Sequence, residues 1–312
     1  MRKIKPVIAA LLAMTIGLFW SPAAIAGLSN KGVLILAHGG TESWNASIRD
    51  IVAQAELPYT TDIAFGMGMS AQEAAQVQEA VNRLEAQGAT EILVVPLLVS
   101  SYSEVYRQYE YLLGVRSDSP WAPNTPPRVT LNVPVRMGSP LDAHPYVADI
   151  LVDRAQALSK DPAHEVVVLV AHGPVNDQDN TAWIAQMQRI ARLVQQQGHF
   201  ARVEARTLRD DAPEAVQQQA TQALRRLVAA ESQAYRVLVV PLLMARGGIE
   251  HKIPERLHGL TYVYSGETLV PHPRIASWIH DAVDQLSHAI ARLTRPRAQR
   301  EPARNVGPIV GT

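Results

Sequence analysis

The chain has 312 residues, 29 basic and 29 acidic side chains, and a formal charge of zero. A balanced charge gives no electrostatic reason to expect nucleic acid or an anionic membrane as a partner. Because the chain has no cysteine, disulfides, thiolate metal sites and cysteine nucleophiles are excluded. Any metal site must therefore use histidine, carboxylate or backbone oxygen ligands.

Residues 1–26 have the features of a secretory signal peptide. Arg2 and Lys3 precede an apolar run over 7–20, and the small-residue pattern AIA follows at 24–26. This order is typical of a signal peptide that is cleaved directly after the AIA pattern. The alternative is an uncleaved anchor, but the apolar run is shorter than the ~20 residues that a membrane span needs. We predict an exported, periplasmic protein whose mature chain has no membrane span.

Three sequence markers recur in the same order in two parts of the chain. They are a strand-like run ending in His-Gly (33–39 and 167–173), a run ending in Val-Val-Pro-Leu-Leu (92–98 and 237–243), and a His-Pro pair (144–145 and 272–273). Three ordered repeats indicate a duplication. We predict two duplicated domains, over 28–158 and 163–292.

Within each half, apolar runs alternate with segments of helical periodicity. The predicted strands are at 33–37, 60–65, 91–95, 129–133, 165–170, 201–206, 235–240 and 261–264. The predicted helices are at 43–56, 70–87, 103–113, 143–158, 180–197, 213–230, 249–258 and 273–292. Continuous Val/Leu/Ile runs indicate strands that are buried on both faces of a parallel sheet. The predicted fold class is α/β, with two Rossmann-like domains that each hold a parallel sheet flanked by helices.

Two segments lack this pattern. Residues 116–128 contain four prolines and predict an irregular loop, either a lid over a site or an ordinary surface insertion. Residues 293–312 are rich in Arg, Pro and Gly and have little to bury, so they are predicted to be a disordered tail.

Two histidines occupy equivalent positions at the predicted sheet edges. His38 and His172 each follow the first strand of their half and precede a glycine. Ligands of open α/β sheets bind beyond the carboxyl ends of the strands. One such histidine could be a structural turn residue, but the same placement in both halves favours a functional site.

The loop after each third strand reaches the same edge. It carries Glu104 in the first half, and Glu250 with His251 in the second. Histidine and glutamate without thiolate suit a borderline divalent metal and supply bases near neutral pH. The alternative is that Glu104 and Glu250 only stabilise the N-terminus of the following helix, where acidic residues are favoured.

The order and duplication of these motifs resemble the class II tetrapyrrole chelatases, in particular the CbiX-like sirohydrochlorin cobalto- and ferrochelatases in a two-domain form. Protoporphyrin ferrochelatase is a more distant resemblance. The resemblance covers about 28–292 and implies an enzyme of the lyase class that inserts Co²⁺ or Fe²⁺, with Ni²⁺ a further candidate, into a tetrapyrrole. It implies no cofactor beyond this metal substrate and no nucleic-acid partner.

The resemblance also implies roles for the site residues. His38 and His172 match the family's histidine after the first strand, and Glu104 fits the carboxylate of the ferrochelatase metal loop. CbiX-like enzymes usually carry a second histidine eight residues after the strand-end proline, where this chain has Glu104 and Ile249. His251 lies two positions later.

We expect the second half to carry the chemistry. His172 is the expected proton acceptor and metal ligand, assisted by Glu250 and His251, while His38 and Glu104 form a paired or vestigial site in the first half. The alternative function is a periplasmic metal- or tetrapyrrole-binding protein without turnover, such as a metallochaperone. A periplasmic solute-binding protein would also fit two α/β lobes, but it does not explain the repeated His-Gly motif.

Overall fold

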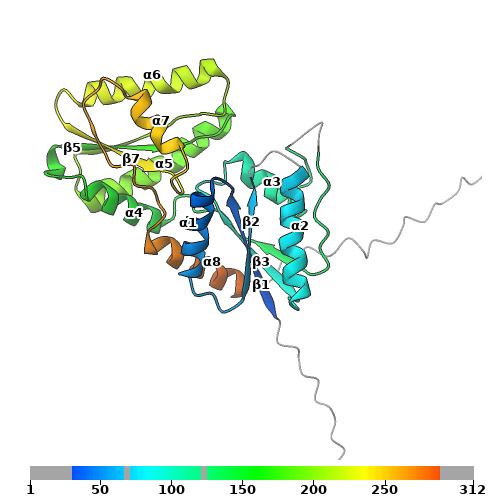
Figure 1. Ribbon diagram of the computed structural model, residues 1–312. Coiled ribbons are helices and arrows are strands. Elements are labelled where there is room, and N and C mark those ends of the chain that lie inside the picture. Colours follow the sequence, from blue (N-terminus) through cyan, green and yellow to red (C-terminus); the bar gives the residue numbers. More distant parts are fainter. Residues whose placement is uncertain (1–29, 67–70, 121–124, 289–312) are drawn as a thin grey trace, which may run out of the picture.

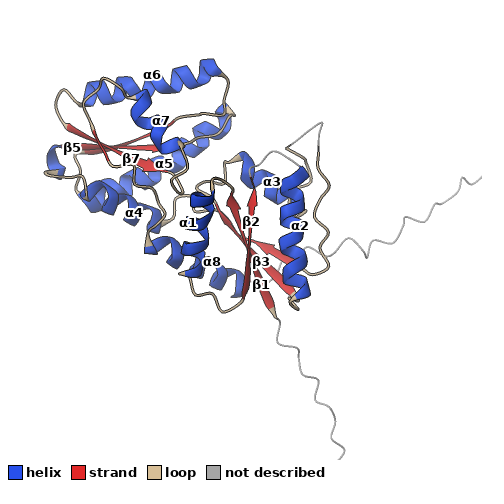
Figure 2. Ribbon diagram, viewed as in Figure 1, coloured by secondary structure: helices blue, strands red, loops and turns tan. Residues whose placement is uncertain are grey.

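The computed structural model describes residues 30–66, 71–120 and 125–288, which form two α/β halves (Figure 1). Each half contains a four-stranded parallel sheet with helices packed on it (Figure 2). This arrangement confirms the predicted fold class. The predicted signal peptide (1–26) and the predicted tail (293–312) lie outside the described residues. Among the described helices, none combines the length and apolarity that crossing a membrane requires.

The first half alternates strands and helices from its first strand onward. Its strands are β1 (Lys31–His38), β2 (Thr60–Gly66), β3 (Glu91–Leu97) and β4 (Val135–Met137). Its helices are α1 (Glu42–Ala53), α2 (Ala71–Ala86), α3 (Glu104–Leu112) and α4 (Pro145–Gln156). The strand order is β2-β1-β3-β4, so β1 lies inside the sheet. Its carboxyl end therefore lies near the middle of the edge that the carboxyl ends of the strands form.

The second half repeats this plan after a short 3₁₀ turn (Pro162–His164). Its strands are β5 (Glu165–Ala171), β6 (Arg202–Thr207), β7 (Arg236–Leu242) and β8 (Val263–Tyr264). Its helices are α5 (Asp177–Gly198), α6 (Glu214–Glu231), α7 (Ile249–Arg256) and α8 (Pro273–His288). The strand order β6-β5-β7-β8 is that of the first sheet, so β5 occupies the position of β1.

The central strands are buried on both faces, as their apolar sequences predict. In β1, alternate side chains such as Ile35 and Leu36 enter two different apolar clusters. In β5, Leu169 and Val170 do the same. The cluster that contains Ile35 also contains Leu169, so one face of each sheet contributes to a single core that both halves share.

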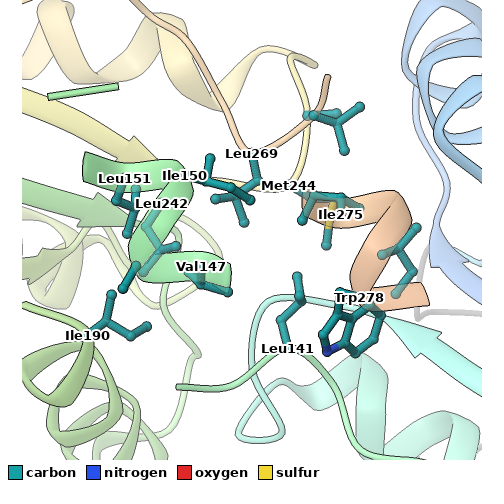
Figure 3. Close-up of a cluster of buried hydrophobic side chains, with 14 of the residues drawn as sticks. Leu141, Val147, Ile150, Leu151, Ile190, Leu242, Met244, Leu269, Ile275 and Trp278 are labelled. Carbon is teal, nitrogen blue, oxygen red and sulfur yellow. The ribbon is translucent and has the colours of Figure 1, made fainter. Parts of the chain in front are cut away.

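Two helices cross between the halves within this shared core. Helix α4 packs against α5 and β7 of the second half, and α8 packs against α1 and β3 of the first. Figure 3 shows apolar side chains of this region, including Val147 and Ile150 of α4 and Ile275 and Trp278 of α8. The exchange means that each half needs a helix from the other repeat to complete its apolar packing.

The strand predicted at 129–133 is wrong, because the edge strand β4 begins only after Pro134. The alternating apolar residues of 129–133 pack against the core, but their backbone amides do not join the sheet. Thr130 N instead donates to Gln78 Oε1 at 2.6 Å, and Asn132 N donates to Glu85 Oε1 at 2.9 Å. Side chains of α2 therefore take the hydrogen bonds that a ladder would have used. The other predicted strands and helices agree with the structure to within a few residues wherever the chain is described.

Candidate functional site

His38 and His172, called here the rim histidines, lie at the carboxyl ends of the two central strands. His38 is the last residue of β1, and His172 directly follows β5. The Nδ1 atom of His38 donates to the Gly39 carbonyl oxygen at 2.6 Å, and Nδ1 of His172 donates to the Gly173 carbonyl oxygen at 2.9 Å. Because a carbonyl can only accept, each ring keeps its proton on Nδ1 when neutral. Each rim histidine therefore presents its Nε2 atom, and not Nδ1, to a metal or a proton.

A tight turn places each imidazole at the sheet edge. Gly173 has φ +78°, and a Cβ there would lie 2.5 Å from the Cβ of Thr207. Only glycine fits such a close approach with this backbone conformation. In the first half, Gly39 N donates to the Gly66 carbonyl oxygen at 2.7 Å, which holds the turn against β2.

Asp211 is a site residue that the sequence reasoning missed. Its Oδ2 atom lies 3.5 Å from His172 Nε2, and its side chain is 74% exposed. The side chain of the neighbouring Asp210 is 3% exposed and forms ion pairs with Lys252 and Arg256, so of these two aspartates it is Asp211 that faces the histidine. A signal was present, since this Asp-Asp pair follows the predicted strand 201–206 and so belongs to the edge that carries His172.

The surroundings of His38 favour its neutral form. Burial lowers the pKa of His38, and the charge of nearby His172 lowers it further, against opposing effects of the Gly39 hydrogen bond and the Asp211 carboxylate. The two rim histidines and Asp211 thus act on one another electrostatically across the two halves. A neutral imidazole is the form that binds a metal or accepts a proton.

Glu104 begins helix α3 but does not cap it. The N-cap of α3 is Ser103, whose side chain accepts from Val105 N. Glu104 Oε1 instead accepts from Val175 N of the second half at 2.9 Å. Its carboxylate therefore binds the loop that follows His172 rather than its own helix.

The β3–α3 loop and helix α3 have further bonds to helix α5 of the other half. Buried Gln186 accepts from Ser100 Oγ at 2.6 Å and donates to Asp142 Oδ1 at 2.6 Å. Arg107 forms an ion pair with Asp179 at 2.7 Å. These contacts hold the β3–α3 loop of the first half firmly against the second half.

Glu250 caps the loop that precedes its own helix, which agrees with the alternative considered for it. It is 4% exposed, and its Oε2 accepts from Gly247 N at 3.0 Å and from Gly248 N at 2.9 Å. Burial raises the pKa of Glu250, but the hydrogen bonds from backbone amides outweigh this effect and the pKa is lowered. Its other oxygen, Oε1, lies 3.3 Å from Nε2 of His251, an imidazole that is 78% exposed.

The predicted ligands form pairs rather than one cluster. Within the described ranges, no three His, Asp or Glu side chains are grouped so that they could hold a metal ion. The pairs present are His172 with Asp211 and Glu250 with His251. A catalytic metal site keeps open positions for substrate, so pairs that leave ligand positions to the substrate are compatible with metal transfer. The assignment of His38, His172, Glu104, Glu250 and His251 to the site stays a prediction.

Trp44 connects the turn after His38 to the loop before Glu250. Its Nε1 donates to the His38 carbonyl oxygen at 2.8 Å, and its ring meets the His38 ring edge-on at 6.2 Å between centroids. The same indole lies against Gly247, where a Cβ would come within 2.6 Å of Trp44 Cε3. One aromatic side chain of the first half thus touches both functional loops.

A cavity of ≈ 540 Å³ lies where these two loops meet. Thr41 and Ser43 line it from the first half, and residues 246–248, 250–251 and 264–266 line it from the second. Small-molecule sites typically have volumes of about 300–1,000 Å³. The loop that carries Glu250 and His251 therefore borders a space that a ligand could enter.

Comparisons with known proteins identify a protein family whose model matches both halves of the chain. The model of the CbiX family matches residues 32–158 and again residues 166–286. No curated protein matches the chain by sequence.

Solved structures show the same fold. The chain is similar to SirB from Bacillus subtilis with Fe³⁺, with a TM-score of 0.60, 17% identity, and coverage of 83% of this chain and 96% of SirB. It is also similar to the sirohydrochlorin chelatase SirB from Bacillus subtilis subspecies spizizenii in complex with cobalt, with a TM-score of 0.58, 17% identity, and coverage of 82% and 95%. DR2241 from Deinococcus radiodurans, a multi-domain protein with structural similarity to chelatases, matches with a TM-score of 0.50 and 18% identity, over 83% of this chain and 55% of its own. At these identities the structures establish the fold.

Proposed function

The chain belongs to the CbiX family, and from this premise we propose that it inserts a divalent metal, cobalt or ferrous iron, into a tetrapyrrole such as sirohydrochlorin. The observation that carries the proposal is the pair of rim histidines, His38 and His172, which each donate through Nδ1 and so present Nε2 at the sheet edge. The similarity to SirB structures that hold Fe³⁺ and cobalt supports a metal ion as one substrate.

Metal insertion requires only simple chemistry from the protein. The macrocycle binds M²⁺ through its nitrogens and releases two pyrrole N–H protons, so a base must accept protons while a ligand delivers the metal. A neutral histidine with a free Nε2 can do either task. Burial lowers the pKa of His38 and so favours this state for it.

His172 is the proposed proton acceptor and metal ligand. The Asp211 carboxylate, 3.5 Å from Nε2, would stabilise the imidazolium that forms when His172 takes a proton. Glu250 and His251 are proposed to assist from the neighbouring loop, and His251 is exposed enough to meet an incoming metal ion. His38 and Glu104 would shape the first-half side of the site.

Anaerobic incubation with Co²⁺ and sirohydrochlorin, followed by absorbance, tests turnover. The expected result is a change in the macrocycle spectrum that is faster than the reaction without protein and proportional to protein concentration. Binding of the macrocycle without acceleration would instead favour the non-catalytic binding protein.

Metal binding can be tested separately from turnover. Purified protein should bind Co²⁺ or Ni²⁺, and His172→Ala should weaken this binding clearly. Unchanged stoichiometry and affinity in His172→Ala, His251→Ala and the double variant would show that the second half does not hold the metal.

A further inference from the structure

Arg209, in the loop between β6 and α6, has a buried guanidinium to which the proposed chemistry gives no role. The residue is 7% exposed, and its backbone φ of +58° lies in the left-handed region. Glycine adopts this conformation without strain, whereas another residue persists there only where the surrounding contacts hold it. The side chain of Arg209 therefore supplies contacts that a glycine at this position would lack.

The guanidinium of Arg209 binds the segment that follows His172. Its Nε donates to the Pro174 carbonyl oxygen at 3.1 Å, and its Nη2 donates to the carbonyl oxygen of Val175. Its Nη1 forms an ion pair with Asp177 at 2.5 Å. The backbone N–H of Arg209 also donates to the His172 carbonyl oxygen at 2.6 Å. One residue thus joins the β6–α6 loop to the segment that begins with the rim histidine.

Arg209 also begins the turn that carries Asp211. Ala212 N donates to the Arg209 carbonyl oxygen at 3.0 Å, so Asp210 and Asp211 are the central residues of a turn. The Asp211 carboxylate lies 3.5 Å from Nε2 of His172, and its side chain is 74% exposed. Because so little of this side chain is packed, the turn determines where the carboxylate lies.

The two loops that Arg209 joins are anchored to different parts of the molecule. Val175 N donates to Glu104 Oε1 of the first half at 2.9 Å. The β6–α6 loop is held by helix α6 of the second half, since Gln217 Nε2 donates to two of its backbone carbonyl oxygens at 2.8 Å each. Without the guanidinium of Arg209, each loop would follow its own anchor.

We propose that Arg209 is a positioning residue, which holds the Asp211 carboxylate beside Nε2 of His172 by binding the two loops together. The use of this pair in proton transfer rests on the proposed function. A displacement of about 1 Å between reacting groups can cost about 100-fold in rate, so the separation of the two loops matters for catalysis. Arginine suits this task because its planar guanidinium presents several N–H donors in fixed directions.

The sequence of the first half offers no equivalent of this arrangement. Residues 67–70, which directly follow β2, are Met-Gly-Met-Ser and contain neither arginine nor a carboxylate. Arg209 and Asp211 come just after β6, the corresponding strand of the second half. This difference agrees with the choice of His172 as the proposed proton acceptor.

Arg209→Lys tests the inference. Lysine keeps the positive charge, but its ammonium on a flexible stem cannot bind two carbonyl oxygens and a carboxylate in fixed directions. In crystal structures of the metal-free proteins, the separation of His172 Nε2 from Asp211 Oδ2 should increase by about 1 Å or more in the variant. In turnover assays with Co²⁺ and sirohydrochlorin, kcat should fall about 100-fold while KM for sirohydrochlorin stays within about threefold, because binding is not disturbed.

A double-mutant cycle with Asp211→Asn separates positioning from general damage to the fold. In the wild-type background, Asp211→Asn should lower kcat about 10-fold, as expected for the loss of a charged partner. In the Arg209→Lys background it should lower kcat less than about twofold, because the carboxylate no longer lies beside His172. Equal effects in the two backgrounds would show that Arg209 has only a structural role.

Arg136→Lys is the matched control. The Arg136 side chain is 16% exposed and likewise joins a carboxylate to a backbone carbonyl, through an ion pair with Glu91 and a hydrogen bond to the Leu286 carbonyl oxygen at 2.7 Å. It lies at the amino end of β3, at the sheet edge opposite the rim histidines. Its variant should lower the melting temperature but leave kcat within about twofold of the wild type. If Arg209→Lys does not fold, Arg209→Gln takes its place, because it leaves no buried charge.

An unchanged separation of His172 and Asp211 in the Arg209 variant would overturn the inference, as would an unchanged kcat. If the wild type inserts Co²⁺ into sirohydrochlorin and the variant does so equally fast, the inference fails and the proposed function stands. If the wild type shows no insertion, the proposed function fails, and the separation measured in the variant decides whether Arg209 positions the pair.

Discussion

The carbonyl oxygens of Gly39 and Gly173 determine which nitrogen of each rim histidine a substrate can reach. Both accept a hydrogen bond from Nδ1, so both histidines present Nε2. The halves differ in what surrounds that nitrogen. His172 has the Asp211 carboxylate 3.5 Å away, whereas burial lowers the pKa of His38. At the residue scale, His172 is therefore better equipped to carry a proton.

We predict that His172→Ala loses far more metal-insertion rate than His38→Ala. A positioned general base typically contributes about 10²–10⁴-fold, and of the two rim histidines His172 is the one with a carboxylate 3.5 Å from Nε2 to stabilise the charged ring. Paired turnover measurements on the two variants check this, with melting temperatures as a control for folding. A larger loss at His38 would show that the first half, with Glu104, does the work.

His38 should titrate below the ordinary histidine value of about 6.5 in metal-free protein. Removing the charge of His172 with His172→Ala should raise the pKa of His38, and removing the Asp211 charge with Asp211→Asn should lower it further. Proton NMR of the imidazole resonances measures all three values.

The lowered pKa of His38 also has a consequence for stability. The unfolded chain binds a proton at this residue more readily than the folded protein does, so the contribution of His38 to stability declines as the pH falls through about 6.5. A His38 pKa at or above 6.5 in the folded protein would contradict the argument.

The two loops that follow β3 and β7 are equivalent in sequence position but differ in how they are held. The β3–α3 loop and the start of α3 are bound to the second half through Ser100, Glu104 and Arg107. The β7–α7 loop is held by the internal cap of Glu250, touches Trp44 of the first half, and borders the cavity. Of these two equivalent loops, the β3–α3 loop is thus fixed against the other half, whereas the β7–α7 loop borders the cavity.

Gly247→Ala should displace Trp44 and disturb the His38 turn. The new Cβ would lie 2.6 Å from Trp44 Cε3, and the ring cannot move without straining its hydrogen bond to the His38 carbonyl oxygen. We expect a loss of about 1–3 kcal/mol of unfolding free energy, as for other overpacked sites. Urea unfolding measures this loss.

Gly138→Ala is the matched control for that variant. Its added Cβ would make ordinary contacts of 3.4 Å or more, and the backbone φ is not in the left-handed region. It should change the unfolding free energy by less than about 1 kcal/mol. Equal stability of Gly247→Ala and the wild type would mean that Trp44 is not confined between the two loops.

The whole molecule is built as one packed unit from two repeats. Helix α4 packs on the second half and α8 on the first, and a single apolar cluster joins both sheets. Separating the repeats would expose this cluster to water at a cost of about 25 cal/mol for each Å² of apolar surface.

We predict one cooperative thermal transition for the intact protein. The shared core and the exchanged helices couple the halves, so the calorimetric and van't Hoff enthalpies should agree. A chain limited to residues 27–158 lacks α8 and should not give a cooperative transition of its own. Two separate transitions in the intact protein would show that the repeats fold independently.

Export is proposed from the features of residues 1–26, and it predicts a mature chain that begins at Gly27. Mass spectrometry of the protein purified from the native host, together with cell fractionation, measures the first residue and the compartment. A soluble cytosolic protein that retains Met1–Ala26 would contradict the proposal.

The repeated motifs alone were enough to predict the fold class and the two rim histidines. The reason is that long Val/Leu/Ile runs can be buried only in a sheet covered on both faces, and a histidine placed directly after such a run must lie at the sheet edge. The strand predicted at 129–133 failed because local alternation does not reveal which groups take the backbone hydrogen bonds. In the folded chain, Gln78 and Glu85 take two of them.

Other properties depended on contacts between residues far apart in the sequence. Asp211 meets His172, Glu104 binds Val175, and Trp44 packs on Gly247, and each of these pairs joins different loops. The repeated sequence motifs also do not predict that α4 packs on the second half and α8 on the first. The sequence of an amphipathic helix shows that one face is buried, but it does not show against which sheet. The residue types at the sheet edge are thus a property of the sequence, whereas their partners and charge environment are decided by the tertiary packing of the two halves.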